Sequence, residues 1–479
     1  MTHHFAPVIP GATPGSNTLP VYSPFNGDIV GTVVTSGQSE VETALCNADA
    51  LFRDRSAWLT TTVRIAILQS LKVKMQSRFE ELVIVAVGEG GKPLLDSRIE
   101  VARAIEGVEL CIEGLKTQTG SPVPMGINSA SEGKLVFTRL EPIGVVVAVS
   151  AFNHPLNLIV HQIMPAIATG CPVIVKPAAA TPLSCFSLVN LVIEAGLPAG
   201  WCQCLLTEGH DLAEKLVTDS RVDFFSFIGS ANVGWKLKAK LSPGTRCALE
   251  HGGVAPVIVD EHVAVDRLIP KLLKGGFYHA GQVCVSVQRV FVHQSIVDEL
   301  ACALAAAAQA LVVGDPINEA TEVGPLITAK EVDRVDRWVK SAIKAGALLM
   351  CGGEKISDSL YAPTVLLDPP DDCEVSQKEI FGPVVCIYAY SDFDSAIARA
   401  NALPFAFQAS IFSDNLDVVM AAYKKLNASA VMVNEHTAFR VDWMPFAGLK
   451  QSGLGVGGIP HTMQDMQIEK MLVISSKEI

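Results

Sequence analysis

From about residue 140 onward, short β-branched runs alternate with amphipathic segments of helical spacing. The run "GVVVAVSAF" (144–152) is almost entirely apolar, which is typical of a strand buried on both faces of a sheet. In the segment after it, apolar residues recur at helical spacing, Pro155 suits a first turn and Gly170 suits the position just past a helix end. This order of strand, tight turn and helix predicts a mostly parallel sheet.

The same unit recurs along the chain, which predicts an α/β protein with two Rossmann-like lobes. In the first lobe we expect a helix over 181–198 and further strands in three apolar runs, 172–177, 201–206 and 222–230. A second alternating region predicts the other lobe. It comprises the strand "APVIVD" from Ala255, a helix around Leu300 to Val312, and strands near Val384 and Val431.

The first 140 residues differ from the rest of the chain. They predict helices over 63–87 and 97–115, followed by the polar, Gly-rich strip "GSPVPMGINSASEGK" (120–134) and the strand "LVFTRLEP" (135–142). Such a strip is typical either of an exposed hairpin arm that reaches another subunit or of an ordinary surface loop.

Composition excludes several classes of function. The chain has 479 residues, 49% of them hydrophobic, and a net charge of −12 without a dense Lys/Arg stripe, so nucleic acid is not an expected partner. The N-terminus lacks a secretory pattern, and the apolar stretch 301–313 is shorter than the ~18 residues of a membrane-spanning helix. We therefore expect a soluble, cytoplasmic protein that does not enter a membrane.

Twelve cysteines are scattered through the chain. Their spacing gives no CxxC pair and no Cys/His zinc pattern, so we expect reduced thiols and no metal site. Taken alone, each cysteine is best interpreted as a small buried hydrophobic residue, including Cys284 in "HAGQVCVSVQRV" (279–290).

Seven short segments change the interpretation of Cys284, because they occur together in one order. Over essentially the whole chain they resemble the signature segments of the aldehyde dehydrogenase superfamily. The segments are "AFNHP" (151–155), "VKPA" (175–178), "FIGS" (227–230), "LEHGG" (249–253), "GQVC" (281–284), "EIFGP" (379–383) and "MPFAGLKQSG" (444–453).

The resemblance implies a catalytic set that makes chemical sense. Cys284 matches the nucleophile, whose thiolate adds to the aldehyde so that the adduct can give up a hydride. The side chain of Asn153 and the backbone N–H of Cys284 match the oxyanion donors. Glu250 matches the base that activates water to hydrolyse the thioester to a free acid. Without the family, Asn153 would be a turn residue or helix cap, and Glu250 a paired surface carboxylate.

For a cofactor, the resemblance implies NAD or NADP, although no GxGxxG follows a strand in the first lobe. Many NAD-preferring relatives have a glutamate where this chain has Ala179, so we hypothesise that it uses both cofactors. A helix after Gly229 and Ser230 would face the pyrophosphate. The implied cofactor-binding residues are Phe152, Lys176, Ala179, Gly229, Ser230, Gly234, Glu379 and Phe381.

For the substrate, Arg440 is placed like an arginine of relatives that oxidise small anionic aldehydes, and Arg103 and His154 resemble further anion contacts. The arginine that one such group carries beside its nucleophile is Val283 here. Arg pairs readily with anions, but structural salt bridges explain arginines as often. The resemblance favours a small polar or anionic aldehyde of the lactaldehyde, semialdehyde, phospho-aldehyde or sulfo-aldehyde type.

The resemblance also implies a domain division and a homodimer or homotetramer. The expected parts are a cofactor-binding domain (1–118 and 140–250), a catalytic domain (251–435) and an oligomerisation arm (119–139 and 460–479). Two other hypotheses are a Cys/His thiol hydrolase with His279 or His251 as base, and a catalytically silent member of the fold. His251 itself is best interpreted as a hydrogen-bonded packing residue, and the tail "GLGVGGIPHTM" (453–463) has no assigned role.

Overall fold

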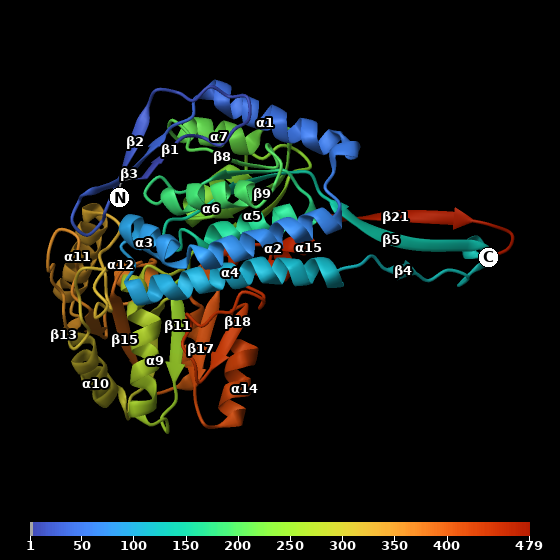
Figure 1. Cartoon of the computed structure of the whole chain (residues 1–479). Coiled ribbons are helices and arrows are strands. Elements are labelled where there is room, and N and C mark those ends of the chain that lie inside the picture. The colour runs from blue at the N-terminus through green and yellow to red at the C-terminus, as the bar shows by residue number, and fades with distance from the viewer. Residues whose placement is uncertain (1–2) are drawn as a thin grey trace.

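Two mainly parallel sheets organise the chain, and the computed structural model describes residues 3–479 (Figure 1). This confirms the predicted α/β fold with two lobes. The first sheet has the order β20 (Gly453–Leu454), β10 (Arg246–Glu250), β9 (Val222–Ile228), β6 (Val145–Val149), β7 (Val173–Lys176) and β8 (Cys202–Cys204). The second has the order β13 (Leu348–Cys351), β14 (Thr364–Leu367), β15 (Val384–Tyr390), β12 (Val287–His293), β11 (Ala255–Val259), β17 (Gln408–Phe412) and β18 (Ala430–Val433).

Strand β6 is buried on both faces, as its apolar run predicts. Val145 and Val147 belong to one hydrophobic cluster, whereas Val146 and Ala148 belong to another on the opposite face. Because alternate side chains of a strand point to opposite faces, helices must cover the sheet on both sides. These helices are α1 (Gln38–Arg53), α2 (Thr61–Ser77), α3 (Phe79–Gly90), α4 (Leu94–Thr117), α5 (Asn157–Thr169), α6 (Leu183–Glu194), α7 (His210–Thr218), α8 (Ala231–Lys238) and α15 (Ile459–Asp465).

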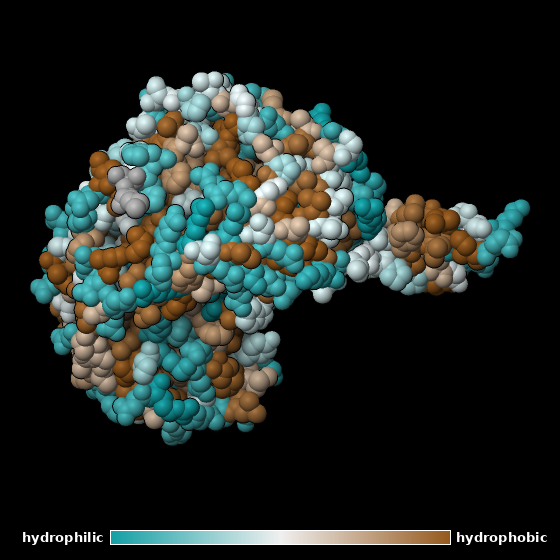
Figure 2. Space-filling view, in the orientation of Figure 1, coloured by the Kyte–Doolittle hydropathy of each residue, from teal (hydrophilic) through white to brown (hydrophobic). Residues whose placement is uncertain are grey.

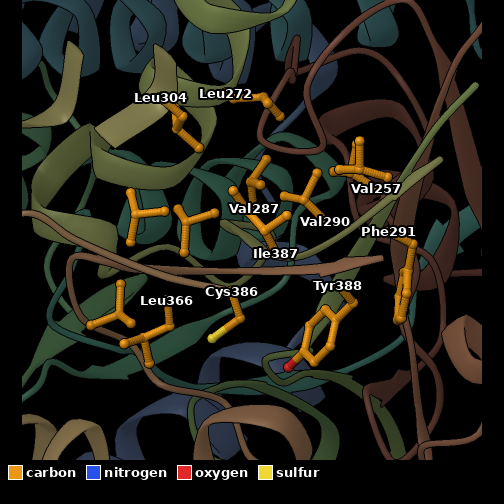
Figure 3. Packing of buried hydrophobic residues seen from close by; sticks show 14 of the residues in the cluster. Val257, Leu272, Val287, Val290, Phe291, Leu304, Leu366, Cys386, Ile387 and Tyr388 are labelled. Atoms are coloured by element: carbon orange, nitrogen blue, oxygen red, sulfur yellow. The ribbon is translucent and has the colours of Figure 1, made fainter. Parts of the chain in front are cut away.

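The second sheet has one continuous core, part of which is shown in Figure 3. Val290 and Ile387 from neighbouring strands are fully buried, together with Leu272 and Leu304 from covering helices. The helices of this lobe are α9 (Val265–Phe277), α10 (Val297–Gln309), α11 (Ala329–Lys344), α12 (Glu374–Gln377), α13 (Phe393–Asn401) and α14 (Leu416–Lys425). Helix α10 ends three residues before the expected Val312.

The single helix expected over 63–87 is wrong: the segment forms α2 and α3, which meet at Arg78. The backbone of Arg78 (φ −112°, ψ 26°) lies outside the helical region. Buried Met75 at the end of α2 and Leu82 in α3 are seven residues apart, which is a helical spacing. The apolar pattern therefore continues across the break, and no Gly or Pro marks it.

A β arm projects from the first lobe (Figures 1 and 2). It consists of β4 (Pro122–Val123), β5 (Lys134–Pro142) and β21 (Gln467–Ser475), and β5 pairs antiparallel with β21 along its whole length. Exposed apolar side chains gather on it, namely Leu135, Phe137, Met471, Leu472, Val473 and Ile474. The polar strip thus belongs to an arm and not to a simple loop.

The arm and the first lobe divide differently from the expected ranges. Strand β5 extends to Pro142, past the expected arm boundary at 139. Helix α15 (Ile459–Asp465), all but the first residue of which falls in the expected arm range 460–479, packs on α4 and α5. The reason is apolar burial, because Ile459 and Met463 are fully buried in the core of the first lobe.

Two small sheets complete the fold: β1 (His3–Phe5), β2 (Thr18–Tyr22) and β3 (Ile29–Val34) form one, and β16 (Phe405–Ala406) pairs with β19 (Leu449–Lys450) in the other. Within residues 3–479, no helix combines the length and apolarity needed to span a bilayer. Those residues also contain no cluster of His, Cys, Asp and Glu that could hold a metal ion.

Candidate active site

The carboxyl ends of three neighbouring strands meet at one edge of the first sheet. Asn153 follows β6, Gly229 follows β9 and Glu250 ends β10. Strands β7 and β8, which follow β6 in the chain, lie on one side of β6 in the sheet, whereas the next strand, β9, lies on its other side. Ligands of open α/β sheets bind at such a topological switch point, so the fold itself directs attention to this edge.

Cys284 approaches this edge from the other lobe, after a short 3-10 segment, η3 (Tyr278–Gly281). His279, Ala280 and Gly281 have φ values of 48°, 54° and 70°, three consecutive left-handed residues. At Gly281 a Cβ would overlap the carbonyl oxygen of Gly382, so only glycine fits. The tight turn brings Cys284 to the wall of the cavity.

One cavity between the lobes collects most of the expected residues. Its lining includes Arg103, Phe152, Asn153, His154, Gly229, Ser230, Glu250, Cys284, Glu379, Phe381 and Arg440. Lys176, Ala179 and Gly234 are outside the lining, although Ala178 and Ala180 belong to it. The structure therefore brings together the expected nucleophile, base, oxyanion donor and substrate contacts in one space.

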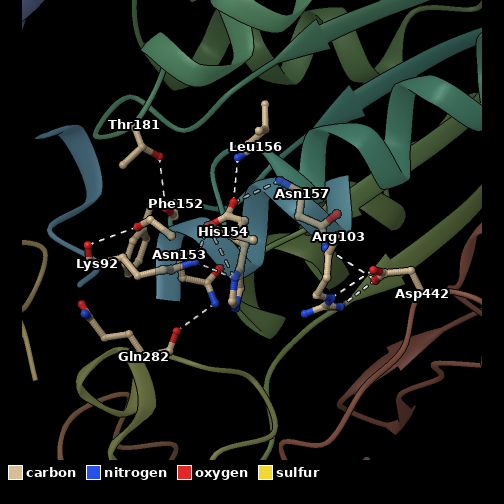
Figure 4. A network of polar contacts seen from close by, with 12 residues as sticks. Lys92, Arg103, Phe152, Asn153, His154, Leu156, Asn157, Thr181, Gln282 and Asp442 are labelled. Atoms are coloured by element: carbon tan, nitrogen blue, oxygen red, sulfur yellow. Dashed lines mark hydrogen bonds and ion pairs between the residues drawn. The ribbon is translucent and has the colours of Figure 1, made fainter. Parts of the chain in front are cut away.

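Asn153 is held in place by the loop that carries Cys284. Its buried side-chain amide donates from Nδ2 to the carbonyl oxygen of Gln282 at 2.8 Å (Figure 4). Gln282 is itself anchored, because its side chain accepts from the N–H of Ile327 at 2.9 Å and donates to the carbonyl of Pro325 at 3.2 Å. An amide NH₂ has two donors, so the second hydrogen of Asn153 is available for an oxyanion.

Burial dominates the electrostatics of the reacting groups. Desolvation raises the pKa of the Cys284 thiol to about 12, and the Arg440 guanidinium opposes this rise. The pKa of Glu250 is also raised by burial, with Arg440 again acting in the opposite direction. A raised carboxyl pKa lies nearer to neutral pH, which suits a general base.

Two glycines make room for two carboxylates. A Cβ on Gly457 would overlap Oε1 of Glu250, and a Cβ on Gly252 would overlap the carboxylate of Glu379. The N–H of Gly253 donates to Oε1 of Glu379 at 3.3 Å, while burial raises the pKa of Glu379 to about 8. Gly457 gives the previously unexplained glycine-rich tail a role, since it lets the Glu250 side chain lie close to the backbone.

The remaining cavity wall fits a nicotinamide dinucleotide. Gly229 and Ser230 line the cavity at the start of α8, and the Ser230 side chain makes no cap there. A helix start of this kind, with N–H groups free of helical partners, suits a pyrophosphate. The rings of Phe152 and Phe381 meet edge to face at 5.7 Å, and Phe381 has a left-handed φ of 50°. Small residues, Ala178 and Ala180, line the wall beside β7.

Three expected cofactor residues are not part of the cavity lining. Lys176 ends β7, its Nζ donates to the carbonyl of Pro177 at 3.2 Å, and burial lowers its pKa. Ala179 is exposed. Gly234 contacts His251: a Cβ there would overlap Nε2 of His251, so the absence of a side chain accommodates the imidazole.

Arg440 reaches the cavity from a buried polar network. Its guanidinium carbon lies 3.6 Å from the ring centroid of Phe446, and Nη2 lies 3.4 Å from Nδ1 of His161. His161 Nε2 is 2.7 Å from Asp442, whose carboxylate also accepts from Arg103 at 2.6 and 3.0 Å (Figure 4). Arg103 thus forms a salt bridge with an internal carboxylate, which is the structural role that the sequence left open for it.

The departures from the family pattern have packing explanations. Val283 is buried in a small cluster with Val285, Phe407 and Phe446. His251 donates from Nδ1 to the carbonyl of Gln451 at 2.9 Å, the direction required by a carbonyl acceptor, and its ring packs against Phe227 and Trp235. Among the described residues, neither His251 nor His279 makes a hydrogen bond to Cys284.

Sequence reasoning missed four charged or polar residues around the cavity: Lys92, Glu100, His161 and Asp442. All four are buried. The only sequence signal was their position, since Lys92 follows a Gly-Gly pair and Asp442 lies two residues after Arg440. Single polar residues of this kind are typical of solvent-exposed faces, so the sequence did not distinguish them.

Comparison with known proteins agrees with this geometry. The model of the aldehyde dehydrogenase family matches residues 12–472. A 3-sulfolactaldehyde dehydrogenase of Priestia megaterium is 36% identical over 412 residues, 86% of each chain. The chain therefore belongs to the aldehyde dehydrogenase family.

Solved structures give the same answer. Aldehyde dehydrogenase 21 from Physcomitrella patens, in complex with the reaction product succinate, has a TM-score of 0.95, 33% identity and 99% coverage of both chains. A glyceraldehyde-3-phosphate dehydrogenase from Methanocaldococcus jannaschii, complexed with NADP, has a TM-score of 0.91 and 32% identity over 96% of this chain and 99% of that one. The protein is an NAD(P)-dependent aldehyde dehydrogenase.

The raised thiol pKa predicts the pH dependence of alkylation at Cys284. The thiolate reacts and the pKa lies near 12, so inactivation by iodoacetamide should accelerate about tenfold per pH unit between pH 6 and 9. Arg440→Met removes an opposing cation, so it should slow inactivation by roughly three- to tenfold at each pH without changing the slope. Residual activity measures the rate, and Cys284→Ser identifies label at other cysteines. A rate independent of pH would mean that the thiolate already forms at rest.

The contact between Gly457 and Glu250 predicts a defect in deacylation. Gly457→Ala should displace the carboxylate and lower steady-state kcat by about 10²-fold or more, within the range for removal of a general base, while the first turnover still gives a burst of reduced cofactor. Stopped-flow absorbance at 340 nm measures both phases. Gly314→Ala is the control, since its methyl would meet only Thr321 Oγ1 at 3.8 Å. Equal loss of burst and steady state would contradict the prediction.

Proposed function

We propose that this enzyme oxidises a small anionic aldehyde to the free carboxylic acid through a thioester on Cys284. The observation that carries the proposal is the Arg440 guanidinium, which lines the same cavity as Cys284 and Glu250. Arginine recognises carboxylate, phosphate and sulfonate oxygens by paired hydrogen bonds, and its charge persists at all physiological pH values.

In the first half-reaction, the Cys284 thiolate attacks the carbonyl carbon. A C–S bond forms, the π electrons move to oxygen, and the oxyanion accepts hydrogen bonds from Asn153 Nδ2 and the backbone N–H of Cys284. The contact between Asn153 and Gln282, at 2.8 Å, orients this donor in advance. The oxyanion electrons re-form the C=O bond as the hydride departs from the same carbon, so a thioester remains on Cys284; a bound NAD(P) would supply the nicotinamide that takes up this hydride.

In the second half-reaction, Glu250 removes a proton from water. The oxygen adds to the thioester carbon, the C–S bond breaks, and the acid leaves while Cys284 returns to the thiolate. The raised pKa of Glu250 supports this role, because such a carboxylate is a stronger base. This route needs the nicotinamide groove, which a thiol hydrolase would not need.

Three residues support an anionic substrate in different ways. Arg440 supplies charge, and its contacts to His161 and Phe446 fix its position. His154 lines the same cavity. Arg103 also lines the cavity, although the paired carboxylate of Asp442 offsets its charge. The 3-sulfolactaldehyde named for one relative and the succinate bound in one solved structure are both anionic, which is consistent with this proposal.

A matched pair of aldehydes tests the proposal. Succinate semialdehyde and butanal have carbon chains of equal length, but only the first is an anion. Arg440→Met should raise KM for the anionic aldehyde by about 10- to 100-fold, the value of a charged hydrogen bond or two, and change KM for butanal by less than about threefold. Absorbance at 340 nm follows turnover, and Cys284→Ala is the inactive control.

The same test includes 3-sulfolactaldehyde as a second anionic aldehyde. A further variant, Arg440→Lys, separates the effect of positive charge from that of the paired N–H donors of the guanidinium group. Lys should recover part of the affinity for the anion, because it restores charge without paired hydrogen bonds. Equal increases in KM for anionic and neutral aldehydes would show that Arg440 does not recognise the anionic group of the substrate. No turnover of any anionic aldehyde by the wild-type enzyme would contradict the proposed substrate class.

We also propose that the enzyme accepts both NAD and NADP. The support is local: Ala178, Ala179 and Ala180 leave no carboxylate beside the end of β7. A 2′-phosphate would therefore meet no like charge there. Lys176, at the end of the same strand, would serve the adenosine ribose.

Ala179→Glu tests the cofactor proposal. A new carboxylate should reduce kcat/KM for NADP by about tenfold or more through like-charge repulsion and change that for NAD by less than about threefold. Ala306→Glu, on an exposed position of α10, is the matched control. A wild-type preference for NAD of about a thousandfold, roughly 4 kcal/mol, would contradict dual use.

For assembly, we propose a homodimer or homotetramer in which the arm meets another subunit. The support is the apolar surface of β5 and β21 (Figure 2), which includes Leu472 at 50% exposure and Met471 at 58%. An exposed apolar edge of this kind is a ready site for pairing with another chain.

A further inference from the structure

A buried ion pair lies beside His154, one of the residues that line the cavity. The pair has no part in the reaction described above. Lys92 follows Gly91 at the end of α3, and Glu100 lies on α4. Their side chains form a salt bridge, and each is only 1% exposed. Burying two charges is unfavourable unless each gains further partners, so the other contacts of the pair are informative.

Glu100 has a structural partner on one side. Its Oε1 accepts from the backbone N–H groups of Leu156 and Asn157 at 2.9 and 3.0 Å, where α5 begins (Figure 4). These contacts account for one carboxylate oxygen. They do not explain why a lysine, and not an apolar residue, occupies position 92.

Lys92 has its second partner in His154. Nζ of Lys92 lies 2.7 Å from Nδ1 of His154. An ammonium group has three donors and no acceptor, so Nδ1 must accept with its lone pair. A neutral imidazole whose Nδ1 accepts carries its hydrogen on Nε2. The contact therefore selects one tautomer of His154 and gives it an N–H donor on the ring edge away from Lys92.

The surroundings favour the neutral ring. Burial, followed by the charge of Lys92, lowers the pKa of His154 well below its ordinary value. Glu100 Oε2 is 3.8 Å from Nδ1, and the rings of Tyr278 and His279 lie at 6.0 and 6.1 Å. Positive charge around the ring comes from Lys92, Arg103 and Arg440.

We propose that Lys92 is a positioning residue that fixes His154 as an Nε2–H donor to an oxygen of the substrate's anionic group. His154 lines the cavity directly after Asn153, so a donor there reaches the same bound molecule as the oxyanion donor. A neutral donor complements Arg440, because it makes a directional hydrogen bond to oxygen without adding a second positive charge. This inference rests on the proposed function, in which His154 faces the aldehyde.

The test removes both charges together, because an unpaired buried carboxylate would destabilise the fold. In Lys92→Met/Glu100→Gln, the Gln side chain keeps an acceptor for the N–H groups of Leu156 and Asn157. KM for succinate semialdehyde should rise by about fivefold or more, the worth of one hydrogen bond, while KM for butanal stays within about twofold. Thermal unfolding reports whether the variant is folded.

A second background separates positioning from structure. His154→Gln supplies an amide donor that has no tautomers, so its function should not depend on Lys92. Adding Lys92→Met/Glu100→Gln to His154→Gln should change KM for the anionic aldehyde by less than about twofold, which is non-additive with the effect in the presence of His154. An equal KM increase in both backgrounds would overturn the proposal and make the ion pair purely structural.

Nitrogen-15 NMR of histidine-labelled enzyme gives a readout that does not depend on turnover. In the wild type, His154 should have a protonated Nε2 and an unprotonated Nδ1, with assignment from the signal lost in His154→Gln. In Lys92→Met/Glu100→Gln, both tautomers should be populated. An unchanged tautomer would overturn the role of Lys92, even if the anionic substrate is correct. Conversely, if no anionic aldehyde is oxidised, the proposed function fails while this spectrum still decides the role of Lys92.

Discussion

The carboxylate of Glu100 holds together three segments whose relative positions define the site. It connects α4 to the first N–H groups of α5 and to Lys92. The turn between β6 and α5 carries Asn153 and His154. Because Glu100 fixes the start of α5, it also fixes the backbone positions of these two residues. A helix start has N–H groups without helical partners, and an anion there also complements the helix dipole. Loss of the acceptor would leave buried donors unpaired, at about 1–3 kcal/mol each.

The site also balances burial against charge. Burial raises the pKa of the Cys284 thiol and of the Glu250 carboxyl, which disfavours the charged form of each group. Arg440 opposes both rises from within the same cavity. Its position depends in turn on His161 and Asp442, which lie outside the reaction itself. One cation thus acts both on the nucleophile and, in the proposed function, on the anionic end of the substrate.

Much of this architecture could be predicted from sequence, because strand and helix periods report burial directly. The same signal failed at Arg78, where an uninterrupted apolar period crosses a real break between helices. Motif resemblance indicated Cys284, Glu250 and Asn153 as candidates for the groups that react, and the structure places all three on one cavity. The resemblance could not reveal Lys92, Glu100 or Asp442, since a buried charge has the same letter as a solvated one and becomes visible only when its partner is in place. The same holds for Gly457, whose meaning is the carboxylate beside it.

The left-handed turn at His279 and Ala280 has a consequence for protein engineering. Side chains with a Cβ occupy this region at a cost of about 1–3 kcal/mol each, which the packing of the second lobe must offset. The loop that presents Cys284 therefore stores backbone strain, and its burial, with His279 and Ala280 each 1% exposed, holds it in place. Thermostable variants would be sought most safely in the helices that cover the sheets. Relaxing this loop would gain stability at the expense of the geometry of the sulfur.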